Sequence, residues 1–273
     1  MKTCVMVIVK DEQEYIQEFI EHHLNIGVDA LFIFEDIGSR SHKHITDKYD
    51  NVYLLSILDV YYGDEKDRIR ERKEKKMAVQ SDYIQHAIKY IKTLGEYDWC
   101  FSLDADEYVQ ADGDIHEILS RFSDWECVIM YWKNYGANGH ILKPQYTSIQ
   151  ETYTKECGFT NIDWNNKIIT KMVLNLREID TSFPIPCHFS PTRRCIRTDF
   201  SRQLSDPPCY DLLYIKHYIT KSFEEYMWKL TKRGMLCKVH RKICDFFEMN
   251  KDMDKEECMR VLEEHQMSNT IIY

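Results

Sequence analysis

Residues that interrupt regular structure are scarce in this sequence, which has nine glycines and six prolines among 273 residues. This scarcity, together with frequent tyrosine, disfavours disorder and low complexity. No apolar run approaches the roughly 20 residues that a membrane-spanning helix needs. Neither G-x-G-x-x-G nor G-x-x-x-x-G-K occurs. The sequence therefore supports neither a dinucleotide-binding Rossmann fingerprint nor a P-loop.

The ten cysteines form no C-x-x-C pair, so no zinc-ribbon or zinc-finger spacing is present. Met1-Lys-Thr leads directly into an apolar segment, which does not fit a secretory leader. We therefore expect free thiols in a reducing cytosol. The expected location is cytoplasmic, with at most peripheral contact at the inner face of a membrane.

Basic residues are fewer than acidic ones: the sequence has 36 Lys and Arg and 45 Asp and Glu, which gives a net charge of −9. Such a balance argues against a nucleic-acid partner, which requires a basic surface. It leaves room for a local basic pocket that could hold a diphosphate. The densest charge run, residues 66–76, is interpreted as a solvated loop or helix face rather than a membrane or acceptor patch.

Apolar runs alternate with segments of helical periodicity through the first hundred residues. Strands are expected over residues 3–9, 30–34, 52–58 and 99–103, and helices over residues 14–26 and 77–94. This order predicts βαβ units and an α/β fold with a largely parallel sheet. Further along, we expect a helix over residues 115–122, a strand over residues 127–132, a helix capped by Ser222 and Glu225, and a last helix near Asp254.

The strand at residues 99–103 runs directly into Asp104, Asp106 and Glu107. Ligands of open α/β sheets collect beyond the carboxyl ends of the strands. On an extended backbone Asp104 and Asp106 point the same way, and two carboxylates on one side suit Mg²⁺ or Mn²⁺. The plainer interpretation of this string is a solvated turn between a strand and a loop.

Four stretches carry a resemblance to a known family. They are Val9-Lys-Asp-Glu12 with the helix after it, Phe34-Glu-Asp36-x-x-Ser39, Asp104-Ala-Asp106-Glu-Tyr, and Lys216-His-Tyr218-x-x-Lys-Ser222-x-Glu-Glu-Tyr226 with Lys229 and Arg233-Gly234. Their order and spacing resemble GT-A-fold glycosyltransferases related to families 2 and 92, of the bacterial or viral surface-glycan type. Asp11, Lys216 and Tyr108 depart mildly from the family pattern.

The resemblance implies a metal-dependent enzyme that moves a sugar from a nucleoside-diphosphate donor, UDP in the first instance, to a glycan hydroxyl with inversion. Its setting would be polysaccharide biosynthesis, and the acceptor a glycan or a lipid-linked glycan. The implied fold is a single GT-A domain over residues 1–273, with a Rossmann-like sheet flanked by helices. Residues 1–110 would form the nucleotide-binding half, residues 111–220 the acceptor and catalytic half, and residues 221–273 the C-terminal helices.

The resemblance also implies ligands for a divalent cation, Mn²⁺ or Mg²⁺. Asp106 would bind the metal directly, and Asp104 would contact the ribose or reach the metal through water. A histidine late in the chain would complete the shell, with His188 as first choice and His217 as second. A packed histidine at the start of a helix remains an alternative for His217.

The remaining implied roles concern the donor and the acceptor. Lys10, Glu12 and Asp36 would hold the base and ribose, and Lys167 would reach the diphosphate, although Lys10 has a plain alternative as a solvated strand end. Glu151 is the candidate general base, with Glu107 and Asp163 as rivals. Lys229 and Arg233 lie four apart and would face the anionic donor or acceptor, unless they form an ordinary solvated helix face.

Two other functions stay open at this point. A nucleotidyltransferase also uses a sheet, carboxylates and metal, but normally has a Gly-rich basic loop where this chain has Lys10-Asp-Glu12. A non-catalytic glycan-binding protein could keep the fold without aligned acids. A haloacid-dehalogenase-like phosphatase is set aside, because its D-x-D follows the first strand and continues into a threonine.

Overall fold

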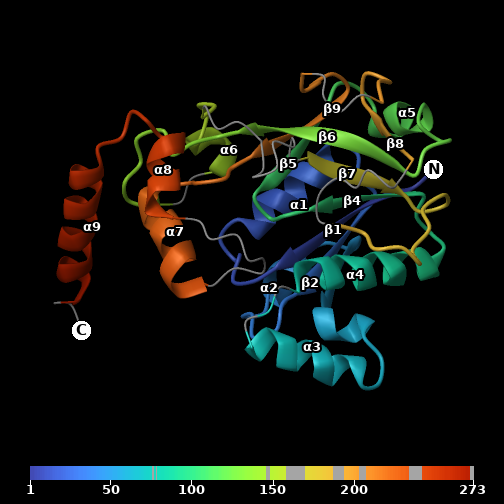
Figure 1. Cartoon of the computed structure of the whole chain (residues 1–273), viewed down its shortest axis with the longest axis horizontal. Coiled ribbons are helices and arrows are strands. Elements are labelled where there is room, and N and C mark those ends of the chain that lie inside the picture. Colours follow the sequence, from blue (N-terminus) through green and yellow to red (C-terminus); the bar gives the residue numbers. More distant parts are fainter. Residues whose placement is uncertain are drawn as a thin grey trace. The chain divides into compact units, whose positions relative to one another are not determined.

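The computed structural model describes residues 1–75, 77, 79–145, 148–157, 170–186, 194–202, 207–233 and 242–270, without the side chains of 232–233 and 266–270. The chain divides into two compact units. The first unit comprises Met1–Trp132 and Asn161–Lys216, and the second comprises Lys133–Thr160 and His217–Tyr273. Figure 1 shows the elements along the chain.

Within the described residues, the strands build one nine-stranded sheet. They are β1 (Thr3–Val9), β2 (Ala30–Glu35), β3 (Val52–Ser56), β4 (Trp99–Leu103), β5 (Glu107–Ala111), β6 (Cys127–Asn134), β7 (Thr170–Asn175), β8 (Cys195–Arg197) and β9 (Leu213–His217). Their order is β3-β2-β1-β4-β7-β6-β9-β5, with β8 paired to β6. Strands β3, β2, β1 and β4 pair in parallel, whereas β7 is antiparallel to both β4 and β6.

Helices accompany the parallel strands of the first unit. They are α1 (Ile16–Asn25), α2 (Lys43–Thr46), the 3-10 turn η1 (Ile57–Val60), α3 (Glu65–Glu74), α4 (Gln80–Leu94) and α5 (Ile115–Ser120). Helix α4 runs beside the parallel strands and buries one apolar side, which includes Tyr83, Ile88 and Ile91 (Figure 1). The predicted α/β class with parallel strands and flanking helices is therefore confirmed.

Buried parallel strands are continuous apolar runs because helices cover both faces of the sheet. Strand β1 follows this rule, since six of its seven residues are buried. The third strand ends two residues before its predicted end. The Ser56 hydroxyl and the Asp59 carboxylate cap the first turn of η1 there, so local hydrogen bonding replaces the strand ladder.

Residues 66–74 of the predicted charge run form most of α3, and this part of the helix is largely exposed, as expected. Two residues depart from that description. Ile69 is buried, and the ammonium group of Lys73 pairs with Asp36 at the end of β2. The run is therefore a helix with one inward-facing edge rather than a wholly solvated segment.

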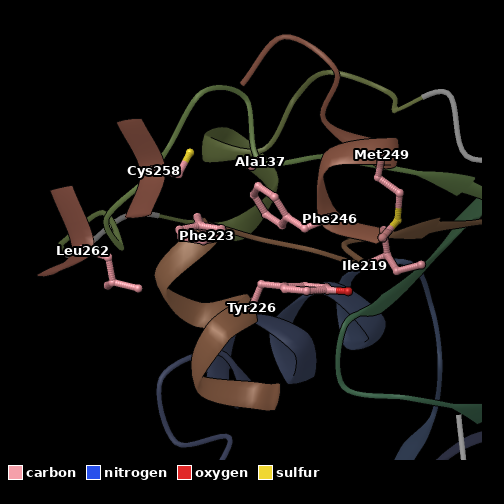
Figure 2. Packing of buried hydrophobic residues seen from close by; sticks show 8 residues of the cluster. All are labelled: Ala137, Ile219, Phe223, Tyr226, Phe246, Met249, Cys258 and Leu262. Carbon is pink, nitrogen blue, oxygen red and sulfur yellow. The ribbon is translucent and has the colours of Figure 1, made fainter. Parts of the chain in front are cut away.

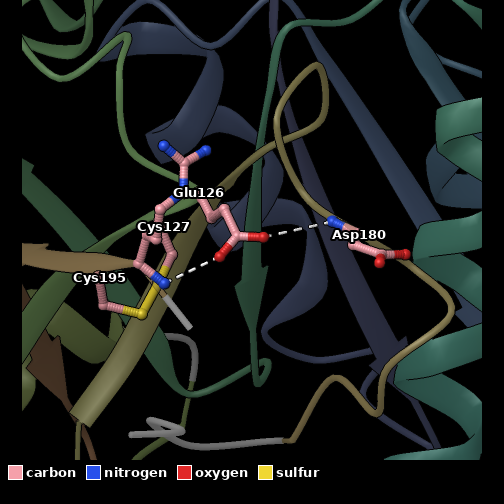
Figure 3. The surroundings of a disulfide bond; sticks show 5 residues. Glu126, Cys127, Asp180 and Cys195 are labelled. Carbon is pink, nitrogen blue, oxygen red and sulfur yellow. Dashed lines mark hydrogen bonds between the residues drawn. A yellow bond between two sulfur atoms is a disulfide. The ribbon is translucent and has the colours of Figure 1, made fainter. Parts of the chain in front are cut away.

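The expectation of free thiols is wrong for two cysteines, because Cys127 and Cys195 form a disulfide (Figure 3). They lie opposite each other on the parallel pair β6 and β8, 68 residues apart in sequence. The carboxylate of Glu126 accepts the amide hydrogens of Arg194 and Asp180 beside it. Pairing of distant strands creates this contact, and no local cysteine spacing signals it.

The second unit contains α6 (Ile149–Thr152), α7 (Phe223–Trp228), a π-helical turn η2 (Lys229–Arg233), α8 (Ile243–Met249) and α9 (Lys255–Thr270). Its core comprises Ala137, Ile219, Phe223, Tyr226, Phe246, Met249, Cys258 and Leu262 (Figure 2). The rings of Phe223 and Phe246 lie 5.0 Å apart between α7 and α8. Both predicted helix starts are confirmed: Ser222 and Glu225 form a capping box, and the Asp254 carboxylate accepts the Glu257 amide.

Among the described helices, none combines the length and the apolar character that crossing a bilayer requires.

Candidate functional site

Three neighbouring parallel strands of the first unit end at one edge of the sheet. Register fixes this arrangement, because Val9 of β1 lies opposite Glu35 of β2, and Val7 lies opposite Leu103 of β4. The residues that follow the strands are Lys10, Asp36 and Asp104, respectively. We call this the strand-end edge. It places residues 10, 36 and 104, which are far apart in the sequence, at the ends of adjacent strands.

The acidic string after β4 is a tight turn rather than an extended segment. Asp104 and Glu107 close it with two bonds: the Asp104 amide donates to Oε2 of Glu107 at 2.8 Å, and the Glu107 amide donates to the Asp104 carbonyl at 3.0 Å. The expectation that an extended backbone aligns Asp104 with Asp106 is therefore wrong. Asp104 and Asp106 lie within this turn at the end of β4, and Glu107 returns inward as the first residue of β5.

Lys171 is a site residue that the sequence reasoning missed. It lies on β7, between β4 and β6, and its side chain is 1% exposed. Its Nζ donates to Oδ2 of Asp104 at 2.9 Å and lies 3.4 Å from Oε2 of Glu107. A lysine directly before the apolar run Met172–Leu174 was the available signal, whereas the resemblance pointed to Lys167, four residues earlier.

The two acids beside Lys171 differ in exposure. The Glu107 side chain is fully buried, whereas that of Asp104 is 41% exposed. Burial raises the pKa of Glu107 well above its usual range, the Lys171 ammonium acts against this rise, and the charge of Asp104 adds to it. The Oε1 atom of Glu107 accepts no hydrogen bond within the described part of the chain. Glu107 is thus an interior acid, and Asp104 borders solvent.

Asp36 is almost fully buried at the end of β2 and is paired with a lysine. Lys73 Nζ lies 2.5 Å from its Oδ2, and the Ile37 amide donates to its Oδ1 at 2.8 Å. Burial, followed by the negative charge of Asp36, raises the pKa of Tyr83 above its ordinary range. Sequence reasoning identified Asp36 and missed Lys73, because Lys73 belongs to a charge run of ordinary appearance.

The turn that follows β1 is tied to the turn that follows β2. Asp11 has a φ of 55°, a backbone region that Asn and Asp tolerate better than most residues. Its amide donates to Ser39 Oγ at 3.1 Å, and its carboxylate accepts the Arg40 amide at 3.0 Å. Burial tends to raise the pKa of Asp11, but these Arg40 contacts lower it overall.

A buried histidine makes a second tie between the two turns. The Glu12 amide donates to Nε2 of His42 at 3.2 Å, so the hydrogen of this ring resides on Nδ1, which lies 3.0 Å from Oε1 of Glu35. These bonds hold Lys10 and Glu12 next to Asp36. The predicted base and ribose ligands are therefore neighbours in the structure.

His217 and Glu151 belong to the second unit. His217 is buried, and its Nδ1 lies 3.0 Å from Oδ1 of Asn134. Because an amide oxygen can only accept a hydrogen bond, the Nδ1 of His217 is the donor. Its other ring nitrogen therefore carries the lone pair that a metal or a proton would use. Glu151 is exposed in the short helix α6, where its amide donates to the N-cap hydroxyl of Ser148.

Several predicted residues lie outside the described part of the chain. They are Lys167, His188 and Asp163. Lys229 lies at the start of η2, and Arg233 ends it without a described side chain. The roles suggested for these residues stay predictions.

The strand-end edge fits a divalent cation in part. The carboxylates of Asp104 and Asp106 are the hard oxygen ligands that Mg²⁺ and Mn²⁺ prefer. Among the described residues, no cluster of three or more His, Cys, Asp or Glu side chains is arranged to hold a metal ion. Such a pair suits a cation whose shell is completed by the oxygens of a bound phosphate ligand.

Comparison with known proteins gives structural neighbours only. No family model matches the sequence, and no curated protein matches it. A197 from STIV is 13% identical, with 80% of this chain and 86% of that chain covered and a TM-score of 0.38. HddC from Yersinia pseudotuberculosis is 12% identical, with 72% and 90% covered and a TM-score of 0.39.

A third neighbour is glucosyl-3-phosphoglycerate synthase from Mycobacterium tuberculosis, solved with Mn²⁺, UDP and phosphoglyceric acid. It is 10% identical, with 64% of this chain and 56% of that chain covered and a TM-score of 0.34. The alignment thus spans about half the length of that protein. At these identities and TM-scores, the likenesses do not assign this chain to a family.

Proposed function

We propose that this protein is a GT-A-type glycosyltransferase that moves a sugar from a UDP-sugar to a glycan hydroxyl with inversion. The observation that carries the proposal is the strand-end edge, where Asp36, Lys10 and the Asp104–Asp106 turn follow three adjacent parallel strands. A nucleoside diphosphate has a neutral, hydrogen-bonding end and an anionic end. The strand-end edge offers a buried carboxylate for the neutral end of the ligand, and carboxylates with lysines for its anionic end.

The nucleotide end of the donor is assigned to Asp36, with Lys10 and Glu12 beside it. A buried carboxylate is a strong acceptor for the N–H of a uracil ring or for a ribose hydroxyl. In the free protein the acceptor oxygen of Asp36 faces Lys73 at 2.5 Å. Donor binding would therefore shift Lys73 from Asp36, and its ammonium would stay near the anionic ligand.

The diphosphate end is assigned to the turn after β4. Asp106 would hold a divalent cation directly, and Asp104 would hold it through water or contact the ribose. Such a cation stabilises the negative charge that develops on a departing diphosphate. Lys167 is proposed for the diphosphate, and His188 or His217 for the metal shell.

Inversion requires a general base for the acceptor hydroxyl. Glu107 is unsuited to this task, because its fully buried side chain cannot reach an acceptor from solvent. Glu151 is exposed and remains our candidate. The proposed acceptor is a glycan or lipid-linked glycan of the kind used in polysaccharide biosynthesis, with no nucleic-acid partner and at most peripheral membrane contact.

The test is a screen of UDP-sugars with Mn²⁺ in which released UDP is measured with and without a glycan acceptor. We expect at least one UDP-sugar to release UDP, and EDTA to abolish the release. A nucleotidyltransferase would instead release pyrophosphate from a nucleoside triphosphate. No UDP release from any donor, combined with no UDP binding by calorimetry, would refute the proposal.

A further inference from the structure

The strand-end edge already contains a cation of its own, the ammonium group of Lys171. It faces the acidic turn that we assign to the diphosphate end of the donor. Its contacts are 2.9 Å to Asp104 and 3.4 Å to Glu107. A divalent cation bound to this turn would have to share Asp104 with a positive charge that is present before any ligand arrives.

The two contacts of Lys171 are not equivalent. Lys171 and Glu107 are 1% and 0% exposed, so their pair is closed to solvent on both sides. Breaking a buried pair by removing one partner is strongly unfavourable, because it leaves an uncompensated buried charge. Asp104 is 41% exposed, so its carboxylate can exchange Lys171 for another partner at lower cost. Lys171 therefore stays with Glu107, and Asp104 is the exchangeable partner.

We propose that Lys171 is a positioning residue that holds Asp104 in the free protein and makes cation binding dependent on the donor diphosphate. This inference rests on the proposed function. A divalent cation alone is opposed by the neighbouring ammonium, since like charges repel strongly where solvent is limited. The anionic diphosphate compensates both positive charges, and cation and nucleotide then bind together with positive coupling.

A second pair of a lysine and a carboxylate lies at the nucleotide end of the proposed site. There Lys73 pairs with the buried Asp36 as Lys171 pairs with Asp104. Asp36 and Asp104, two of the acids assigned to the donor and its cation, are thus each paired with a lysine in the free protein. In a chain with a net charge of −9, such lysines limit the repulsion that an anionic donor would otherwise meet.

The experiment measures Mn²⁺ affinity by calorimetry or electron paramagnetic resonance, with and without UDP. In the wild-type protein we expect UDP to tighten Mn²⁺ binding by at least about tenfold, or ~1.4 kcal/mol. Linkage requires Mn²⁺ to tighten UDP binding by the same factor, which provides an internal check.

The informative variants are Lys171→Met and the double variant Lys171→Met with Glu107→Gln. The double variant also replaces the acid that Lys171 contacts, so neither buried partner is left without the other, and a glutamine oxygen can still accept the Asp104 amide. In both we expect Mn²⁺ alone to bind about tenfold more tightly, and the enhancement by UDP to shrink by that factor. Lys92→Met is the matched control, because Lys92 is a partly buried lysine that donates to the Ile179 carbonyl.

Unchanged Mn²⁺ affinity in both folded variants would overturn the inference, and so would wild-type protein that binds UDP without coupling to Mn²⁺. Loss of the fold in both variants would assign Lys171 a structural role and overturn it as well. Failure of the wild-type protein to bind UDP under any condition would instead refute the proposed function on which the inference rests.

Discussion

At the residue scale, two of the acids proposed for ligand binding pair with lysines that come from elsewhere in the chain. Asp36 pairs with Lys73 of α3, and Asp104 pairs with Lys171 of β7. The ammonium groups of these lysines compensate the negative charges of the two carboxylates before a ligand arrives. Substitution of single acids should therefore separate binding from folding.

Asp106→Asn tests the metal assignment. The substitution keeps size and polarity but removes a charge on the proposed cation. We expect turnover to fall by about 10² or more, or ~2.7 kcal/mol of transition-state stabilisation, with the melting temperature unchanged. Asp112→Asn, at an exposed acid just after β5, is the control and should keep full activity. Wild-type activity in the Asp106 variant, or full wild-type activity in EDTA, would contradict the assignment.

Asp36→Asn tests the nucleotide assignment. Loss of the carboxylate weakens the acceptor for a base or ribose hydrogen and leaves Lys73 without its partner. We expect UDP affinity to fall by about tenfold or more in calorimetry, while Mn²⁺ binding without nucleotide stays the same. Asp47→Asn is a suitable control, because Asp47 forms an exposed pair with Lys43. Equal UDP affinity in the wild-type and Asp36 proteins would show that the base binds elsewhere.

At the element scale, helix ends and strand ends set the local geometry of both units. Serine caps begin α6 and α7, and Gly95, with a φ of 70°, ends α4 in the left-handed conformation that glycine adopts easily. The capping box of α7 was readable from the sequence because Ser222 and Glu225 lie three apart. The contacts that His22 and His23 of α1 make with Val109 were not, because Val109 belongs to the distant strand β5.

Ser222→Ala should destabilise the second unit. Its hydroxyl accepts the Glu225 amide at 3.2 Å and donates to the Glu225 carboxylate at 2.7 Å, and the side chain is buried. Loss of an N-cap typically removes about 1 kcal/mol of stability, so we expect a melting temperature lower by about 2–4 °C. Ser148→Ala, at the cap of the four-residue helix α6, should shift melting less. Equal shifts in melting temperature for the two variants would mean that the capping box of α7 stabilises the protein no more than the single cap of α6.

His23 should make stability depend on pH. Burial, with the charge of His22 adding to it, lowers the pKa of His23 well below its ordinary value. Its Nδ1 donates to the Phe19 carbonyl at 2.8 Å, and its Nε2 accepts the Val109 amide at 3.4 Å, so the folded ring is neutral. Below about pH 6.5 the unfolded chain therefore binds a proton that the folded chain does not.

The sign follows from that difference. The contribution of His23 to the free energy of unfolding is fully present above the pKa that this residue has in the unfolded chain. It is lost as pH falls from about 6.5 toward the lower pKa of the folded state, by at most ~1.4 kcal/mol per pH unit. Urea unfolding of the wild-type protein and of His23→Gln at several pH values tests this. We expect the variant to be less stable at neutral pH but to lose less stability on acidification. Parallel pH curves for the two proteins would rule out His23 as the cause.

At the scale of the whole molecule, the sequence predicted the fold class and the polar positions that follow β1, β2 and β4. This was possible because buried parallel strands can be recognised as apolar runs in the sequence, and the carboxyl ends of parallel strands lie at the same edge of the sheet. Lys171, Lys73 and the disulfide between Cys127 and Cys195 escaped prediction. Each of these contacts depends on which distant strands or helices become neighbours in the fold. The residue type alone does not show whether a lysine is buried or a cysteine is paired.

The most direct test of the central claim compares the affinities of UDP, UMP and uridine with Mn²⁺ and with EDTA. If the nucleotide lies at the strand-end edge, UDP should bind most tightly with Mn²⁺, by about tenfold or more over UMP. EDTA, or the joint change of Asp104→Asn and Asp106→Asn, should remove that advantage and leave weak binding through Asp36. A protein that binds UDP equally well in EDTA and in the double variant, or does not bind it at all, would contradict the account.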